Sequence, residues 1–188
     1  MIKQIISNYK DGNMTSVYMR RAHEEDIKSI VSIINNARYY LKEQGLSQWQ
    51  SGYPNQDTIE EDLVLQRGFV LVVDHQVAGY TAILAGEDPI YTLIEDGQWL
   101  NDETDYIGIH RFAILDKYRG QKLAQRFMTA ILTFFYENGT SDFRIDTHPG
   151  NLPMQAVITG NGFEKRGIVH INEGEEINGV RWAYQLVL

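Results

Sequence analysis

The sequence predicts an α/β fold whose sheet is mixed, mostly antiparallel, and covered by helices on both faces. Segments with the apolar character of strands alternate along the chain with segments whose apolar residues recur at helical spacing. A strand at 106–115 is joined by a helix to a strand at 143–148, and strands connected in this way are usually parallel. The strands at 69–73 and 77–84 instead form a hairpin, which is antiparallel by construction.

Composition restricts the class of protein. The chain has 188 residues, 43% of them hydrophobic, which is enough for one well-filled core, and it contains no cysteine. A disulfide framework, a zinc–thiolate site and a cysteine nucleophile are therefore excluded, and we expect no metal. The net charge of −8 disfavours a nucleic-acid partner. Because no apolar run approaches the ~20 residues of a membrane span and no signal-peptide pattern opens the chain, we expect a cytoplasmic protein without a membrane partner.

The first half of the chain begins with residues 1–16, an N-terminal arm or loose terminus, and we expect a single domain over 17–188. A strand at 17–21 precedes a helix with early acidic residues and apolar positions at helical spacing, which ends near Gly45. A capping box that starts at Thr58 predicts a second, short helix. The acidic segment 86–105 is an insertion, and its role as a lid or as a crossing loop stays open.

The second half centres on the strand at 106–115. A short polar turn follows it, and the next helix opens at 119–124 and stops near Asn138 and Gly139. After the strand at 143–148, Asn151 is well placed to cap another helix, with Pro153 tolerated in its first turn. Two final strands, at 164–171 and 180–188, are separated by an acidic turn at 173–176.

The turn after the central strand has the chemistry of an anion site. A strand that enters a helix through a glycine-bearing turn directs unpaired N–H groups and the positive end of the helix dipole at one point. Four basic residues crowd this turn against one acid, Asp116; they are Lys117, Arg119, Lys122 and Arg126. Neither a Walker loop nor a dinucleotide Gly-x-Gly-x-x-Gly is present here, and the alternative is an ordinary βα unit with a solvated basic first turn.

The segment Arg119–Ala124 resembles the acyl-CoA pyrophosphate loop of the GNAT N-acetyltransferase superfamily, Arg/Gln-x-x-Gly-x-Gly/Ala. Downstream, Asn151 followed by a helix and by Gly162-Phe163 is similar to that family's later pattern, with the same spacing. The resemblance covers about 17–188. It implies a GNAT-like sheet whose parallel central strands splay apart to hold acyl-CoA. It also implies an N-acetyltransferase that moves the acetyl group of acetyl-CoA directly to an amine of a small molecule or peptide, without a covalent acyl-enzyme.

The resemblance also implies site residues. The pantetheine arm would pair with the backbone near Phe112, Ala113 and Ile114, and Asn151 would contact the arm or its sulfur. The pyrophosphate site would comprise the N–H groups of the turn together with two basic side chains, from Arg119, Gly120, Gln121, Lys122, Leu123 and Ala124. Trp49 and Tyr53 are candidates for the acceptor wall, with a packing role at the core edge as the alternative.

Two departures from the family pattern bear on catalysis. Lys122 stands where a second glycine is preferred, and N–H donation survives this change if the local dihedrals are helical. Ile158 stands where many members have a tyrosine that protonates the leaving thiolate. An alkyl amine of pKa near 10 is only ~0.1% neutral at pH 7, so a base is useful. His110 and His148 are the candidates, and a histidine that only hydrogen-bonds beside the core is the alternative for each.

Three functional hypotheses follow. The first is the N-acetyltransferase. The second is a non-catalytic acyl-CoA-binding regulatory module, for which Ile158 is the chief argument. The third is a structural protein with a coincidental βα turn. Many relatives dimerise, so a homodimer is among the expected assemblies, and the identity of the acceptor amine is not readable from the sequence.

Overall fold

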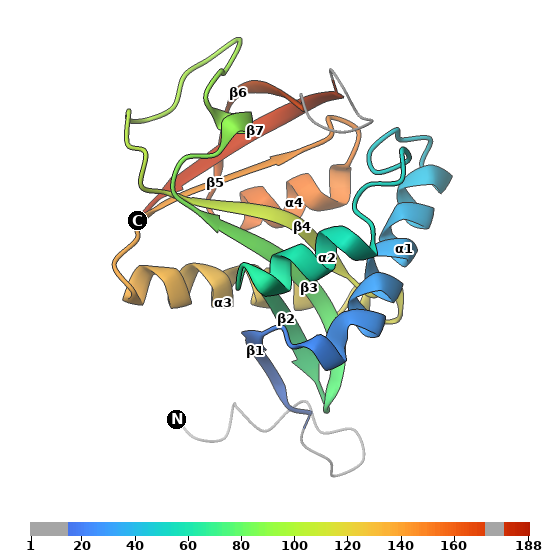
Figure 1. Ribbon diagram of the computed structural model, residues 1–188. Coiled ribbons are helices and arrows are strands. Elements are labelled where there is room, and N and C mark those ends of the chain that lie inside the picture. Colours follow the sequence, from blue (N-terminus) through green and yellow to red (C-terminus); the bar gives the residue numbers. More distant parts are fainter. Residues whose placement is uncertain (1–14, 172–178) are drawn as a thin grey trace.

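The chain folds around a seven-stranded sheet in the order β1-β2-β3-β4-β5-β7-β6 (Figure 1). The computed structural model describes residues 15–171 and 179–188. Among these, β4 and β5 are the one parallel pair of neighbours and the other pairs are antiparallel, as predicted. The strands are β1 (Val17–Arg21), β2 (Gly68–Val73), β3 (Gln76–Ala85), β4 (Ile107–Ile114), β5 (Asp142–Thr147), β6 (Glu164–Ile171) and β7 (Gly179–Val187).

The described part of the chain contains four α-helices between these strands: α1 (Ile27–Glu43), α2 (Gln56–Val64), α3 (Leu123–Glu137) and α4 (Leu152–Gly160). Short 3-10 turns, η1 (Glu24–Asp26), η2 (Pro89–Tyr91) and η3 (Asp116–Tyr118), precede α1, follow β3 and follow β4. The predicted start of the second helix is wrong. Asn55 caps α2 by accepting the Thr58 N–H at 2.9 Å, so Thr58 is the third residue of the capping box. The capping box that forms therefore runs from Asn55 to Thr58, and the helix begins before the position predicted from Thr58.

The helices cover both faces of the sheet (Figure 1). On one face, α3 and α4 contribute Phe127, Ile131 and Ile158 to the largest core cluster, which also contains Ile109 and Ile145 of the central strands. On the other face, α1 and α2 pack on β2, β3 and β4 through a second cluster, which contains Ile30, Ile34, Ile59, Val70, Tyr80 and Ala113. None of the helices in the described ranges is long and apolar enough to cross a bilayer.

The central strand β4 contains a bulge. Tyr80 of β3 opposes Ala113, whereas Ala82 opposes His110, so β4 carries one extra residue over this stretch. Arg111 lies in the bulge with φ of 52°, in the left-handed region. Ile109 and Phe112 pack with the α3 side, while the Arg111 side chain reaches Asp62 of α2 on the opposite side. The bulge thus points the neighbouring side chains of His110 and Arg111 to the same face, which strict alternation would forbid.

The insertion at 86–105 is a docked strap that crosses the sheet face opposite α3. Glu95 forms a two-bond bridge with Ile168 of β6, with both N–O distances at 2.8 Å. Trp99 donates its indole N–H to the Tyr91 carbonyl at 2.9 Å, and the Leu100 N–H binds the Gln185 side chain at 2.7 Å. These contacts decide between the two sequence hypotheses in favour of a crossing segment. The expected acidic turn at 173–176 and most of the arm at 1–16 lie outside the described residues.

Candidate active site

A cleft opens where the two parallel strands separate. The ladder between β4 and β5 has three pairs, the last of them Ile109 with Ile145, and beyond it the strands diverge. A cleft of about 650 Å³ occupies this fork and continues to the start of α3. Its walls come from α1, the loop before α2, β4, β5 and the first half of α4. Clefts of this size at the carboxyl ends of parallel strands are common ligand sites.

The structure brings most of the sequence-predicted binding residues together in this cleft. Its lining includes Phe112, Ala113, Ile114, Arg119, Gly120, Lys122, Leu123, Ala124 and Asn151. Gln121 lies outside the lining, and its side-chain amide donates instead to the Lys117 carbonyl at 3.2 Å. The two candidate acceptor residues, Trp49 and Tyr53, line the other end of the same cleft.

The turn between β4 and α3 has the conformation of an anion cradle. Gly120 has φ of 76°, and Lys122, the N-cap of α3, has φ of 58° and ψ of 18°. The condition of helical dihedrals at Lys122 is therefore not met, because this residue adopts the left-handed conformation that glycine occupies at lowest cost. Alternating left-handed residues turn successive N–H groups toward one concavity, at the positive end of the α3 dipole. The Arg119 guanidinium stacks on the Tyr40 ring, 3.7 Å from its centroid.

His110 is the first β4 residue beyond the last paired position of the fork. Its Nε2 lies 2.7 Å from the Asp88 Oδ2 in the insertion, at ion-pair distance but with an angle too bent for a regular hydrogen bond. The Tyr91 ring stacks on the imidazole, with centroids 5.7 Å apart and planes inclined by 19°. Burial alone would raise the pKa of Asp88, but contact with His110 and the Ile90 N–H outweigh it and lower that pKa. Asp88 is thus an anion at neutral pH.

Asp146 occupies the equivalent position on β5, directly after Ile145. It lines the cleft, accepts the Tyr91 hydroxyl at 2.9 Å and lies 3.7 Å from Nε of Arg181. Burial raises the pKa of Asp146 despite the opposing influence of His110 and Arg181. Tyr91 therefore connects the two branches of the fork, since its ring contacts His110 and its hydroxyl contacts Asp146.

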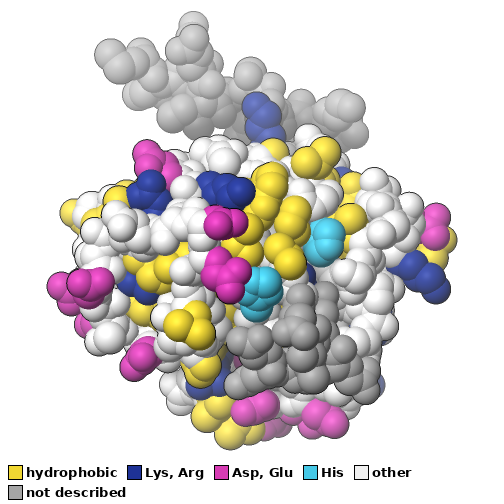
Figure 2. All heavy atoms as spheres, turned by 90° about the horizontal axis from the view of Figure 1, so that it is seen from above, with side chains coloured by type: hydrophobic (Ala, Val, Ile, Leu, Met, Phe, Trp, Pro, Cys, Tyr) yellow, Lys and Arg dark blue, Asp and Glu magenta, His cyan; other side chains and the backbone are white. Residues whose placement is uncertain are grey.

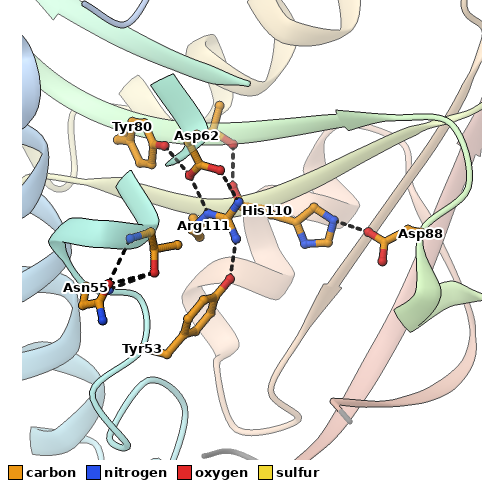
Figure 3. A network of polar contacts seen from close by, with 9 residues as sticks. Tyr53, Asn55, Asp62, Tyr80, Asp88, His110 and Arg111 are labelled. Carbon is orange, nitrogen blue, oxygen red and sulfur yellow. Dashed lines mark hydrogen bonds and ion pairs between the residues drawn. The ribbon is translucent and has the colours of Figure 1, made fainter. Parts of the chain in front are cut away.

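A second polar network holds the other side of His110 (Figure 3). Arg111 donates two hydrogen bonds to Asp62, from Nε at 2.9 Å and from a terminal nitrogen at 2.6 Å, and a third to the Tyr53 hydroxyl. Asp62 also accepts the Tyr80 hydroxyl at 2.6 Å. Burial opposes the charge of Arg111, but Tyr53 and Asp62 raise its pKa. The network fixes the candidate acceptor residue Tyr53 to the strand that carries His110.

The remaining sequence candidates are placed as follows. Asn151 caps α4 by accepting the Met154 N–H at 3.3 Å, and its amide N–H₂ donates to Gln48 at 3.2 Å. His148 follows β5, accepts the Gly150 N–H on Nδ1 at 3.0 Å and is not among the residues that line the cleft. Ile158 lies on the buried side of α4, is fully enclosed in the core, and also does not line the cleft.

Sequence reasoning missed Asp88, Tyr91, Asp62 and Arg111. The dipeptide Asp88-Pro89 carried a local signal, because Asp before Pro is a common start for a helical turn, and Asp88 does cap η2 through the Ile90 N–H at 3.0 Å. Nothing in the sequence connects that cap to His110. Among the described residues, no group of three or more His, Asp or Glu side chains is arranged to hold a metal ion.

One face of the molecule carries mixed charge. Figure 2 shows one face on which hydrophobic side chains gather near histidine side chains, with acidic and basic side chains interspersed around them. The basic residues of the cradle, Arg119 and Lys122, are thus a local feature of a chain whose net charge is −8. Screening over ~10 Å makes such a local cluster matter more than the total charge.

Comparison with known proteins identifies the family. Residues 34–163 match the model of the Acetyltransferase (GNAT) family. A GNAT-family acetyltransferase from Streptococcus agalactiae is 33% identical, with a TM-score of 0.83 over 92% of this chain and 95% of that one. A GNAT-family acetyltransferase from Listeria monocytogenes is 19% identical, with a TM-score of 0.68 over 92% and 95%.

A third solved structure, the ribosomal L7/L12 alpha-N-protein acetyltransferase RimL in complex with coenzyme A, is 16% identical, with a TM-score of 0.67 over 92% of this chain and 94% of that one. At such identities, the Listeria and RimL structures show the shared fold alone. No curated protein sequence matches this chain significantly. The family model covers more than half of the chain, and the Streptococcus structure is alike over nearly all of it. The chain therefore belongs to the GNAT family of acetyltransferases, which use acetyl-CoA as the acetyl donor.

Proposed function

We propose that this acetyltransferase moves the acetyl group of acetyl-CoA directly to the amine of a small molecule or a peptide, in the cleft between β4 and β5. The observation that carries the proposal is the continuity of that cleft. One end reaches the left-handed turn and the basic residues at the start of α3, and the other reaches His110, Trp49 and Tyr53. A donor bound at the first end and an acceptor at the second would meet at the fork.

The donor end fits coenzyme A. The first N–H groups of α3 have no acceptor within the helix, and Gly120 with Lys122 turns the preceding backbone toward the same point, as a pyrophosphate requires. Arg119 and Lys122 add positive charge beside it. On the side that faces β5, β4 has no partner strand beyond Ile109 in the described ranges, whereas its other side stays paired with β3. Backbone groups near Phe112 to Ile114 on the unpaired side are therefore available to the pantetheine amides. Bound acetyl-CoA would supply the acetyl thioester.

The acceptor end offers a base. His110 lines the cleft, and we propose that it accepts the proton which the amine must lose as its nitrogen bonds to the acetyl carbon. His148 lies outside the lining and is the weaker candidate. The aromatic walls, Trp49 and Tyr53, would desolvate the amine, which favours its neutral, nucleophilic form.

The leaving group needs little help. Ile158 is buried away from the cleft and has no proton to give, so the tyrosine acid of other members has no equivalent at this position. A thiol of pKa near 8.5 departs readily as a thiolate. The absence of this acid therefore slows the reaction without preventing it. The non-catalytic binding module is not favoured, because the chain belongs to a family of acetyltransferases.

We propose that residues 17–188 form a single catalytic domain. The family model and the Streptococcus structure together cover almost all of this range, which supports the proposal.

A cytoplasmic location agrees with the use of acetyl-CoA as the donor. The acceptor is a primary amine in this proposal. The protein amine named for RimL supports testing peptide N-termini beside small amines.

Calorimetric titration with acetyl-CoA tests the donor site. The variant Arg119→Ala, Lys122→Ala should bind more weakly by about 1 kcal/mol or more, the value of one or two charge-assisted hydrogen bonds. The matched control, Lys28→Ala, Lys42→Ala, makes the same change in net charge at exposed positions outside the cleft and should bind normally. Equal binding by both double variants would remove the cradle from the proposal.

Turnover tests the acceptor end. Release of free thiol from acetyl-CoA is followed with a panel of small primary amines and short peptides. The variant His110→Ala should lose roughly 100-fold or more in kcat/KM, within the range for general bases, and should still bind acetyl-CoA. Acetyl-CoA binding without acetyl transfer to any amine of the panel would instead support the binding module.

A further inference from the structure

The insertion at 86–105 contacts His110 through Asp88 and Tyr91, two residues that do not line the cleft. Asp88 Oδ2 lies 2.7 Å from Nε2 of the imidazole, and both side chains are largely buried, with 3% and 11% exposed. The Tyr91 ring stacks on the face of the imidazole. Figure 3 shows Asp88 approaching His110 from the side away from the Arg111 network. A buried carboxylate at one ring nitrogen defines what the other nitrogen can do.

We propose that Asp88 is a positioning residue, which keeps the Nε2 proton of His110 in place so that the Nδ1 lone pair faces the amine. This inference rests on the proposed function, since it assigns the atom that acts as base. When the amine attacks the acetyl carbon, the N–C bond forms and the C–S bond breaks. The amine proton moves to Nδ1, and the thiolate carries away the electron pair. The carboxylate of Asp88 then stabilises the imidazolium that has formed.

The bent angle of the contact does not argue against this role. Hydrogen bonds between catalytic groups are commonly long or poorly aligned before the substrate binds and tighten in the reactive complex. The carboxylate itself is fixed, because its other oxygen accepts the Ile90 N–H at 3.0 Å and the Asp88 N–H binds the Tyr106 hydroxyl at 2.8 Å.

The insertion that carries Asp88 is held firmly on the sheet. The bridge between Glu95 and Ile168 joins it to β6, and Arg144 of β5 donates to the Glu103 carbonyl at 3.0 Å. A Cβ added to Gly97 would lie 1.8 Å from the Arg166 carbonyl oxygen, so the strap and β6 touch backbone to backbone. Asp88 therefore approaches His110 from a rigid element, which is what a positioning residue requires.

Other polar and charged groups lie around His110. They come from four elements packed around it: Asp88 after β3, Tyr91 on η2, Asp146 on β5 and Arg181 on β7. Arg111, its neighbour on β4, is paired with Asp62. Arg181 Nε lies 3.7 Å from Asp146 Oδ2, so the guanidinium offsets the charge of that carboxyl. Asp88 is the carboxylate in direct contact with the imidazole.

Steady-state kinetics of the full chain test the proposal with Asp88→Asn. The amide is isosteric and keeps an acceptor for the Ile90 N–H, but it presents an N–H₂ group or a neutral oxygen to His110. We expect kcat/KM to fall roughly 100-fold with acetyl-CoA affinity unchanged. We also expect the acid limb of its pH profile to move to lower pH, because the imidazolium has lost its carboxylate. Asp88→Glu should recover part of the loss. The control Glu87→Gln removes the neighbouring, exposed carboxylate and should behave as wild type.

Two further measurements distinguish positioning from structural support. The double variant Asp88→Asn, His110→Ala should be no slower than His110→Ala alone. If Asp88 acts only through His110, its substitution has no further effect once the imidazole is gone. Nitrogen-15 NMR of the imidazole should show the Nε2-protonated tautomer in wild type and an altered tautomer mixture in Asp88→Asn, a readout that needs no acceptor. An unchanged tautomer and unchanged pH profile in Asp88→Asn would overturn the proposal. Absence of acetyl transfer by wild type would overturn the proposed function instead.

Discussion

Removal of the Asp62 carboxylate should destabilise the whole domain through the charge it leaves behind. Asp62 is 3% exposed in its side chain and accepts two hydrogen bonds from Arg111 and one from the Tyr80 hydroxyl. In Asp62→Ala, the Arg111 guanidinium, itself 10% exposed, keeps its charge without a counterion. Breaking a buried ion pair on one side typically costs about 3–5 kcal/mol. The orphaned Tyr80 hydroxyl would add about 1–3 kcal/mol if it found no water.

These costs overlap, because both result from loss of the same carboxylate, so we expect about 4 kcal/mol in total. For a domain of this size, that loss corresponds to a melting temperature lower by roughly 8–16 °C. The assay is denaturant unfolding followed by circular dichroism, supported by calorimetry. The control Glu61→Ala removes the adjacent, exposed carboxylate on the same helix and should change stability by less than about 0.5 kcal/mol.

The double variant Asp62→Leu, Arg111→Met separates charge from packing. Replacing both members of a buried pair by apolar residues is often neutral or stabilising, so this variant should recover most of the stability that Asp62→Ala loses. Its catalytic rate should be lower than that of the wild type, because the hydrogen bond from Arg111 to the Tyr53 hydroxyl is lost with the ion pair. A loss below about 1 kcal/mol in Asp62→Ala, or a double variant as unstable as the single one, would refute the buried-charge reasoning.

Three further outcomes are expected. Gly97→Ala should lower kcat, measured by kinetics, more than it lowers acetyl-CoA affinity, measured by calorimetry. A Cβ at this position collides with the Arg166 carbonyl and displaces the strap at 86–105. Activity equal to that of the wild type would show that the strap tolerates movement. Lys122→Gly should raise stability by about 1 kcal/mol in thermal unfolding, since glycine adopts the left-handed N-cap conformation without the side-chain penalty, while acetyl-CoA binding weakens through loss of charge. Burial raises the pKa of Asp26, but the Arg20 guanidinium and the His23 N–H together outweigh burial and lower that pKa. The stabilisation by Asp26 is therefore present above its unfolded-state pKa and is lost as pH falls through its folded-state pKa. Asp26→Asn should flatten the acid limb of stability against pH, and an unchanged slope would contradict this assignment.

The secondary-structure elements and the candidate donor site follow from local patterns in the sequence. The periodicity of apolar residues located the strands and helices to within a few residues, and the helix between β4 and β5 made them parallel. The anion cradle is a local property of a strand, a glycine turn and a helix, so Arg119 and Gly120 could be identified without the fold. These features depend on neighbours along the chain, which is why a sequence reveals them.

The contacts beside His110 become visible only in the folded protein. A single bulged residue, Arg111, turns two successive side chains to one face, and no alternation pattern announces such a bulge. Asp88 and Asp62 reach β4 from segments 22 and 49 residues away, so their roles depend on how the strap and α2 pack on the sheet. Lys122 adopts a conformation that its type disfavours because the surrounding turn and helix impose it. Contacts between distant segments and backbone conformations imposed by packing are not encoded in any local pattern, and the three-dimensional fold is needed to reveal them.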